Sequence, residues 1–99
     1  MVIKRPSSKI GFVLVTFQLP SNTWAETVHL VGDFNGWNNQ SHPLTRSRDD
    51  DAWHITLELE EGRAYQFRYL INGMDWQNDW QADRYVPNPF GGDNSVLDI

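Results

Sequence analysis

The chain has 99 residues, a net charge of −5 at pH 7 and no cysteine. Its 39% hydrophobic and 13% aromatic content is typical of one folded domain, and its acidic balance disfavours nucleic acid and anionic membranes, which attract lysine and arginine. Without cysteine it can form neither a disulfide nor a thiolate zinc site, which favours a reducing, cytoplasmic location.

The first eight residues form a short basic segment with Pro6 and two serines. We therefore predict a flexible tail over residues 1–8 and a single folded domain over residues 9–99. The apolar run Ile10–Phe17 loosely resembles a secretory signal, but apolar residues at 13, 15, 17 and 19 alternate with their neighbours as in a strand. This favours a first strand over residues 9–19, and no segment reaches the ~20 apolar residues of a membrane helix.

Alternation of apolar and polar residues is strictest from Trp53 to Glu60 and recurs from Tyr65 to Ile71, so both stretches are predicted as half-buried strands. Asn72 and Gly73 accept the positive φ angles of a type I′ turn, so residues 74–77 should pair back on the preceding strand. Shorter strands are predicted over residues 26–31, 43–45 and 94–99, with a long loop over residues 78–93. About seven antiparallel strands without a helical period predict an all-β sandwich.

The stretch Val31–Trp37 ends a predicted strand in a sharp polar turn. Gly32, Asn35 and Gly36 tolerate unusual backbone angles there. Trp37 follows directly, with four polar residues after it and little apolar sequence to bury into. Two interpretations are open: the ring stays on the surface to bind something flat and partly apolar, or it folds back and caps the core, since tryptophan is usually mostly buried.

Catalysis has little support in the sequence. Acidic residues gather in a turn at 49–51 or are expected to face outward at 58 and 60, so they do not suggest the facing carboxylate pair of a glycosidase. The three histidines share no metal-ligand spacing, and the calcium-like start Asp33–Asn35 is followed by Trp37 at the next ligand position. No phosphate-binding glycine motif and no nucleophile motif occurs. We therefore predict no catalytic residue, no metal and no cofactor.

Binding is better supported, because flat rings alternate with planar hydrogen-bonding side chains. Arg68 is expected on the outward face of its strand, and Trp76 lies just beyond the Asn72-Gly73 turn, across from that face. Such a set matches a glucose ring, whose apolar C–H face stacks on indole while its hydroxyls need donors and acceptors. Trp76 could instead only stabilise the hairpin through cross-strand pairing, and Arg68 could form a salt bridge with a nearby acid. The candidate acids are Asp75 and Asp79.

Four segments occur in a characteristic order: VGDFNGW at 31–37, PLTR at 43–46, YQFRYLING at 65–73 and NPFGGDNSV at 88–96. From about residue 9 to residue 99 the chain thereby resembles the carbohydrate-binding modules of family 48. These are the isoamylase N-terminal-like, early-set domains found beside glycogen branching and debranching enzymes and in the β subunit of AMP-activated protein kinase. The resemblance implies an immunoglobulin-like β-sandwich that binds α-1,4-linked glucans.

The resemblance also implies which residues bind the sugar. Trp37 and Trp76 match the two stacking tryptophans of the glycogen-sensing members, and Asn94 matches their sugar-binding asparagine. The other three positions depart from the family pattern: Arg68 replaces a lysine, Phe90 replaces a leucine that pushes against the glucan, and Gly92 replaces a threonine. Arginine keeps the charge but changes the donor geometry, phenylalanine enlarges the wedge, and glycine removes a hydroxyl.

We therefore expect a cytoplasmic β-sandwich that binds glycogen- or starch-like α-glucan without catalysis and that targets or regulates a glycogen-metabolising partner. The rival hypothesis, from another class, is a protein-interaction or scaffold module that uses the same aromatic patch. The first hypothesis requires both indoles, Trp37 and Trp76, to lie in water on one flank of the sandwich.

Overall fold

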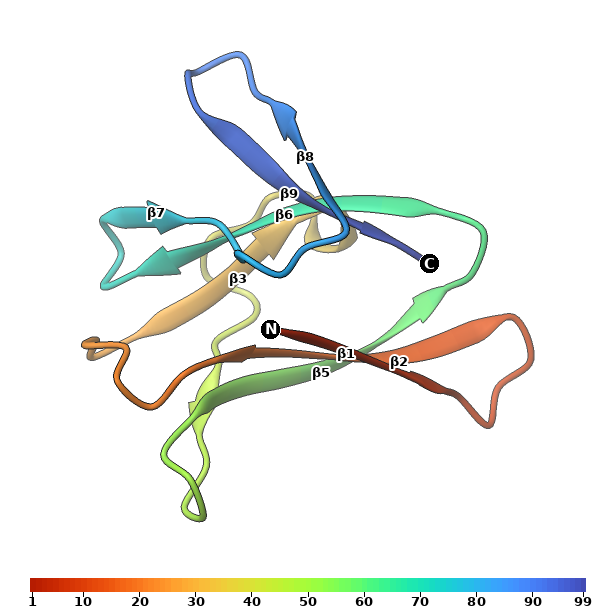
Figure 1. The fold of residues 1–99 in the computed structure, drawn as a ribbon, viewed down its shortest axis with the longest axis horizontal. Coiled ribbons are helices and arrows are strands. Elements are labelled where there is room, and N and C mark those ends of the chain that lie inside the picture. The colour runs from red at the N-terminus through yellow and green to blue at the C-terminus, as the bar shows by residue number, and fades with distance from the viewer.

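The computed structural model describes residues 1–99 as two antiparallel β-sheets packed face to face (Figure 1). One sheet has the strand order β1-β2-β5-β4 and the other β3-β6-β9-β8, with β7 pairing on β6. The strands are β1 (Val2–Pro6), β2 (Phe12–Leu19), β3 (Val28–Gly32), β4 (Thr45–Arg46), β5 (Trp53–Glu60), β6 (Ala64–Ile71), β7 (Asp75–Gln77), β8 (Arg84–Pro87) and β9 (Asp93–Asp98). The one helical element is the 3₁₀ turn η1 (Asp33–Asn35), and none of the helical structure has the length or apolar character needed to cross a bilayer. The expected all-β sandwich is confirmed, with short additional strands.

The core lies between the sheets and follows from the alternation of side chains along the strands. Phe67 of β6 meets Phe17 of β2 across the gap, edge to face, with ring centroids 5.1 Å apart. Such aromatic pairs add about 0.5–1.5 kcal/mol beyond the burial itself. The alternate residues of β6, namely Gln66, Arg68 and Leu70, consequently face away from this core, on the outer surface of the second sheet.

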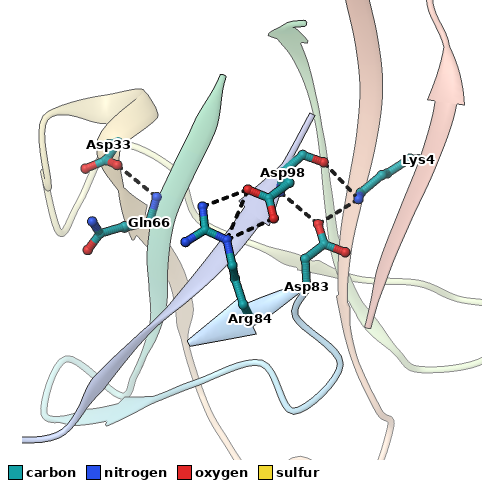
Figure 2. A network of polar contacts seen from close by, with 6 residues as sticks. All are labelled: Lys4, Asp33, Gln66, Asp83, Arg84 and Asp98. Atoms are coloured by element: carbon teal, nitrogen blue, oxygen red, sulfur yellow. Dashed lines mark hydrogen bonds and ion pairs between the residues drawn. The ribbon is translucent and has the colours of Figure 1, made fainter. Parts of the chain in front are cut away.

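The predicted flexible tail over residues 1–8 is corrected by the structure, because Val2–Pro6 form strand β1 along the free edge of β2. An open edge offers unpaired backbone N–H and C=O groups, and the tail satisfies them. Lys4 then reaches the second sheet (Figure 2), where its Nζ donates to Asp83 Oδ2 over 2.7 Å and to the carbonyl of Asp98 over 3.0 Å. The basic charge that suggested a tail therefore helps to close one side of the sandwich.

The long loop predicted over residues 78–93 is also partly wrong, because Arg84–Pro87 form β8 and pair with β9. Proline is tolerated there because β8 is an edge strand and Pro87 ends it. Arg84 strengthens the pairing through a two-pronged contact with Asp98, with Arg84 Nη2 and Asp98 Oδ1 2.9 Å apart (Figure 2). The remaining loop, residues 88–92, is a hairpin tip that projects from the sheet at the top of Figure 1.

The remaining strand predictions hold with shifted ends. Trp53–Glu60 is confirmed, while the strand expected over residues 9–19 begins at Phe12 and the one expected over 43–45 lies at Thr45–Arg46. The hairpin after β6 is confirmed: Asn72 and Gly73 have φ angles of 53° and 69°, and β7 pairs back on β6. The ends moved because they depend on pairing partners elsewhere in the chain rather than on local sequence.

Asp79 ties the connection between β7 and β8 to the core. It is completely buried, its Oδ2 accepts hydrogen bonds from the Tyr69 hydroxyl over 2.8 Å and from the Met1 amino group over 2.7 Å, and its backbone N–H donates to Ser95 Oγ over 2.9 Å. Burial raises the pKa of Tyr69 well above its usual value, and the neighbouring Asp79 carboxylate raises it further. Tyr69 therefore remains a protonated donor to this carboxylate.

Candidate functional site

The turn that carries Trp37 is held by one side chain, Asn35. Its Oδ1 accepts the backbone N–H of Gly32 over 3.1 Å, and its Nδ2 lies 3.1 Å from the carbonyl of Leu30. Gly36 and Trp37 follow with φ angles of 64° and 60°, and the Trp37 N–H donates back to the carbonyl of Gly32 over 2.9 Å. These two consecutive residues in the left-handed backbone conformation reverse the chain. A positive φ is uncommon for tryptophan, which indicates that contacts with the surrounding residues hold the turn.

Gly32 lets this turn lie directly against β6. Its backbone is extended, with φ near −176°, so the constraint is space and not a positive φ. A Cβ built at this position would lie 2.5 Å from the Gln66 carbonyl oxygen, 2.8 Å from the Phe67 Cβ and 2.9 Å from the Phe34 ring. No side chain fits between these atoms, so glycine at this position sets the distance between the turn and β6.

Asp33 fixes the ring of Trp37. Its Oδ1 accepts the indole Nε1–H over 2.9 Å, and its Oδ2 accepts the backbone N–H of Gln66 over 2.8 Å; Figure 2 shows the second contact. Trp37 lies outside the core cluster and retains 37% of its accessible surface. Of the two interpretations left open by the sequence, the ring therefore does not cap the core but lies half-exposed at the outer surface of the second sheet.

Trp37 borders a cleft of about 610 Å³ on that surface. The cleft is lined by residues of the Trp37 turn, β6, β7, β9 and the β8–β9 hairpin: Trp37, Gln66, Arg68, Trp76, Asn88, Pro89, Phe90, Gly91 and Asn94. Five of the six site residues predicted from sequence are thus brought together, although they come from segments far apart in the chain. The sixth, Gly92, does not line the cleft.

Trp76 and Arg68 form one unit on the cleft wall. Trp76 pairs with Leu70 across the β6–β7 hairpin, so Arg68 is its diagonal neighbour on the same face. The Arg68 guanidinium carbon lies 5.8 Å from the centroid of the Trp76 ring, within the range of a cation–π contact. Trp76 therefore does pair across the hairpin, yet the residue keeps 43% of its accessible surface.

The salt bridge considered for Arg68 is not formed. None of the ion pairs of the molecule includes Arg68, and Asp79 is instead buried under Tyr69. The Nε of Arg68 is buried and has no hydrogen-bond partner. The charge of this guanidinium is accordingly balanced by no carboxylate and faces the indole alone.

A chain of amides forms the floor of the cleft. Asn94 Nδ2 donates to Gln66 Oε1 over 3.0 Å, and Asn88 Nδ2 donates to Asn94 Oδ1 over 3.3 Å. Asn88 Oδ1 in turn accepts the backbone N–H of Phe90 over 2.9 Å. Asn94 is 9% exposed and already uses both ends of its amide, so one N–H and one lone pair remain for a ligand. The chain links the floor directly to the hairpin tip.

The hairpin tip presents Phe90, which is 95% exposed. Gly91 and Gly92 follow with φ angles of 91° and 80°, which favour glycine. The carbonyl of Gly92 accepts the backbone N–H of Asn88 over 3.0 Å. Gly92 therefore closes the tip through its backbone. The resemblance to the family placed Gly92 in the site, but Gly91 is the glycine that lines the cleft.

Sequence reasoning missed three supports of the site, namely Asp33, Gln66 and Asn88. Gln66 could have been found, because it shares the outward face of β6 with Arg68. Asp33 and Asn88 could not, because their partners are a backbone N–H and an amide on other strands.

The lining residues include no aspartate, glutamate, histidine or hydroxyl side chain, so the cleft offers ring faces, amides and one guanidinium. These groups can stack on and hydrogen-bond to a neutral polar ligand.

A β-sandwich with an open aromatic and amide-lined cleft on one sheet has the architecture of a ligand-binding module. The family model for carbohydrate-binding module 48, the isoamylase N-terminal domain, matches residues 14–90. This match covers most of the chain and all of the strands from β3 to β8. The chain belongs to this family of carbohydrate-binding modules.

Curated relatives agree with the family. The chain is 37% identical over 63 residues to the 1,4-alpha-glucan branching enzyme GlgB of Butyrivibrio fibrisolvens, an alignment that covers 63% of this chain and 10% of that protein. It is 40% identical over 63 residues to GlgB of Bacillus caldolyticus, covering 63% of this chain and 9% of the enzyme. With GlgB of Pseudomonas aeruginosa the identity is 37% over 60 residues, covering 60% and 8%. The chain thus spans a tenth or less of the length of these relatives.

Proposed function

We propose that this protein binds α-1,4-linked glucan, such as glycogen, starch or maltooligosaccharide, in the cleft and without catalysis. The observation that carries the proposal is that Trp37 and Trp76 line the same cleft, with the Arg68 guanidinium beside one ring. Family membership supports carbohydrate as the ligand class. The names of the relatives, which are 1,4-alpha-glucan branching enzymes, support an α-glucan as the carbohydrate.

The chemistry of glucose suits these groups. The C–H face of the sugar is apolar and stacks on the exposed indole of Trp37 or Trp76, while the hydroxyls at the ring edge need donors and acceptors. Arg68 supplies donors beside one ring, and Asn94 supplies its remaining N–H and lone pair on the cleft floor. Phe90 adds an apolar wall on the hairpin tip. A run of glucose units would therefore lie between the Trp37 turn and the β8–β9 hairpin.

The expected affinity is modest. Covering ~100 Å² of ring face at each tryptophan contributes ~2.5 kcal/mol. A few hydrogen bonds add roughly 0.5–1.5 kcal/mol each, while association and ordering cost ~4 kcal/mol or more. The remainder corresponds to a micromolar to millimolar Kd, so a polymer with many adjacent sites would be held better than a short oligosaccharide.

The biological role that fits is targeting. A module of this affinity concentrates whatever it is attached to, or associated with, on a glucan particle. We include in the proposal a cytoplasmic location and a glycogen-metabolising enzyme as partner. The absence of acidic and nucleophilic side chains from the cleft supports binding rather than hydrolysis or transfer.

Affinity electrophoresis in glycogen gels tests the proposal. Wild type should be retarded relative to a glycogen-free gel, and Trp37→Ala and Trp76→Ala should each weaken retardation by about tenfold or more in apparent Kd, because each loses ~2.5 kcal/mol of stacking. Trp80→Ala is the matched control, since this tryptophan is 78% exposed and lies outside the cleft. Folded wild type that migrates without retardation would overturn the proposal.

The second candidate is a protein-interaction module. It is favoured by Phe90, which projects almost fully exposed beside Arg68 and Trp76, because aromatic and arginine residues often dominate protein interfaces. The glycogen gel separates the two functions, since a protein interface predicts no retardation. A purified glycogen-metabolising enzyme that binds wild type but not Trp76→Ala, in the absence of glucan, would support this second function.

A further inference from the structure

Trp24 is a further exposed tryptophan, to which the proposed function assigns no role. It lies in the connection between β2 and β3, is 96% exposed and takes part in no aromatic pair or hydrogen bond. It does not line the cleft at Trp37. A single exposed apolar residue needs no explanation by itself. Trp24, however, borders a pocket of its own, of about 310 Å³, lined by Ser21, Asn22, Thr23, Trp24, Ala25, Glu26 and Arg46.

The connection that carries Trp24 is tied down at both ends. At its start the backbone N–H of Thr23 donates to the carbonyl of Pro20 over 3.0 Å. At its end the side-chain Oδ1 of Asn72 accepts the backbone N–H of Glu26 over 2.7 Å and that of Thr27 over 3.2 Å. Asn72, the residue that makes the β6–β7 turn, therefore also clamps this connection. The pocket is preformed rather than a passing shape of a free loop.

The pocket is rich in hydrogen-bonding groups without partners. Arg46 enters from β4, its Nε donates to the carbonyl of Asp51 over 3.3 Å, and its terminal nitrogens make no hydrogen bond within the protein. The Glu26 carboxylate forms no ion pair, and the side chains of Asn22 and Thr23 form no hydrogen bond. The Arg46 guanidinium also lies over the Trp53 ring, with its carbon 5.4 Å from the ring centroid. The pocket thus combines an exposed indole with the terminal nitrogens of Arg46 and with a carboxylate, an amide and a hydroxyl that have no hydrogen-bond partner in the protein.

We propose that this pocket is a second carbohydrate site, which takes the end of an α-glucan chain or a short stretch of it. The choice of ligand rests on the proposed function, because the pocket combines the same groups as the cleft: a bare indole and planar hydrogen-bonding side chains. Its volume is about half that of the cleft and lies at the small end of ligand sites, so it accommodates fewer glucose units. A protein partner fits less well, since the pocket also holds the Glu26 carboxylate, and glutamate is depleted at protein interfaces.

The two sites lie on different surfaces of the sandwich. The cleft lies on the outer face of the β3-β6-β9 sheet and is lined in part by the β8–β9 hairpin, which projects at the top of Figure 1. The Trp24 pocket is lined by the β2–β3 connection, drawn in orange at the left of Figure 1, and by Arg46 of β4, which belongs to the other sheet. Two glucan chains could therefore be held at once. Bivalence of this kind strengthens binding to a branched particle without any new contact at either site.

Fluorine NMR of protein carrying 5-fluorotryptophan tests the proposal, because each of the five tryptophans gives a separate signal. Signals are assigned from single Trp→Phe variants, and wild type is then titrated with maltoheptaose to millimolar concentration. The Trp24 signal should shift and saturate, and it should do so again in Trp37→Ala, or in Trp76→Ala if the first variant is unfolded. Cellohexaose, which is β-linked, should leave it unchanged, and the Trp80 signal serves as the internal control.

A Trp24 signal that does not move would overturn the second site, whether or not the cleft signals respond. The same holds if the shift disappears in a folded Trp37→Ala variant, or if cellohexaose produces it equally. Movement of Trp24 with static Trp37 and Trp76 signals would retain the pocket and overturn the proposed role of the cleft. If both sites bind, Trp24→Ala should raise the apparent Kd for glycogen roughly three- to tenfold and leave the maltoheptaose shift of Trp37 unaltered.

Discussion

The carboxylate of Asp33 holds the indole of Trp37 against strand β6. One oxygen accepts the indole N–H over 2.9 Å, and the other accepts the backbone N–H of Gln66 over 2.8 Å. The indole has only one polar atom, and Asp33 already occupies it. Trp37 therefore offers a ligand its ring face but no hydrogen-bond donor. A fixed ring also loses less conformational freedom when a ligand stacks on it.

Asp33→Asn should weaken glucan binding through the position of Trp37. The amide keeps one acceptor oxygen but turns an N–H₂ group toward the other donor, so one of the two hydrogen bonds is lost and its donor is left unpaired. Both hydrogen bonds are exposed, so water can reach the freed donor, and we expect a loss of about 0.5–1.5 kcal/mol in the free energy of unfolding. The apparent Kd for glycogen should rise roughly three- to tenfold, which corresponds to about 1 kcal/mol. Urea denaturation and glycogen gels measure the two effects.

A structural readout separates positioning from general destabilisation. In the ligand-free Asp33→Asn variant, the indole N–H signal of Trp37 should shift in the nitrogen-15 correlation spectrum, while that of Trp80 stays in place. Weakened glycogen binding with an unmoved Trp37 signal would contradict the positioning role of Asp33.

Gly32→Ala should destabilise the fold at the base of the same turn. The added Cβ would lie 2.5 Å from the Gln66 carbonyl oxygen, which belongs to the central strand β6 and cannot move away as a flexible side chain could. Overpacking of this kind costs about 1–3 kcal/mol. Gly11→Asn is the matched control, because Gly11 has φ +83° with open space around it, a conformation that asparagine tolerates. Equal urea midpoints for both variants would refute the steric argument.

The fold could be predicted from sequence wherever a strand carries its own evidence. Trp53–Glu60 alternates strictly and Tyr65–Ile71 nearly so, and Asn72-Gly73 specifies its turn by backbone chemistry alone, so the sequence predicts these elements correctly. Strands β1 and β8 were not, because each is an edge strand without clear alternation that exists only through pairing with a neighbour. Whether such a segment forms a strand depends on its tertiary contacts and cannot be read from its local sequence.

The candidate site likewise contains residues that the sequence could predict and residues that it could not. Trp37, Trp76 and Arg68 could be anticipated because large or charged side chains at outward positions are conspicuous in a sequence. Gln66 and Asn88 are ordinary polar residues whose place in the cleft depends on strand register and on a hairpin that was predicted as loop. The resemblance to a family supplied residue roles that periodicity alone could not, but it pointed to Gly92 where the cleft uses its neighbour.

Tyr69→Phe should destabilise the protein at neutral pH and flatten its response to alkali. The variant removes a donor from the buried Asp79 carboxylate, at a cost of about 1–3 kcal/mol. In wild type the pKa of Tyr69 is raised by burial and by Asp79, so its stabilisation is fully present below the unfolded tyrosine pKa of about 10. It is lost as pH rises through the folded value, by up to ~1.4 kcal/mol per pH unit.

Urea denaturation at neutral and at alkaline pH measures this difference. Wild type should lose more stability than Tyr69→Phe between the two conditions, and the gap between the two proteins should narrow as pH rises. Tyr85→Phe is a comparison variant, because its hydroxyl bonds a backbone carbonyl, that of Asp79, rather than the carboxylate. A constant gap between wild type and Tyr69→Phe across the range would contradict the assigned coupling.

Arg68 offers the sharpest test of how the cleft discriminates between ligands, because two variants separate its charge from its geometry. Arg68→Met keeps an unbranched side chain over the Trp76 ring but removes every donor, so we expect the apparent Kd for maltoheptaose to rise about tenfold or more, the equivalent of at least one charge-assisted hydrogen bond. Arg68→Lys keeps the charge and changes the donor geometry, so it should bind within about threefold of wild type but favour oligosaccharides of a different length.

Titration calorimetry with maltotriose, maltopentaose and maltoheptaose measures both effects. Arg63→Met is the control, since Arg63 is exposed and lies outside the cleft. If Arg68→Met bound every oligosaccharide as wild type does, the guanidinium would serve only to support the Trp76 ring, and the polar contacts of the ligand would have to come from the amide floor alone.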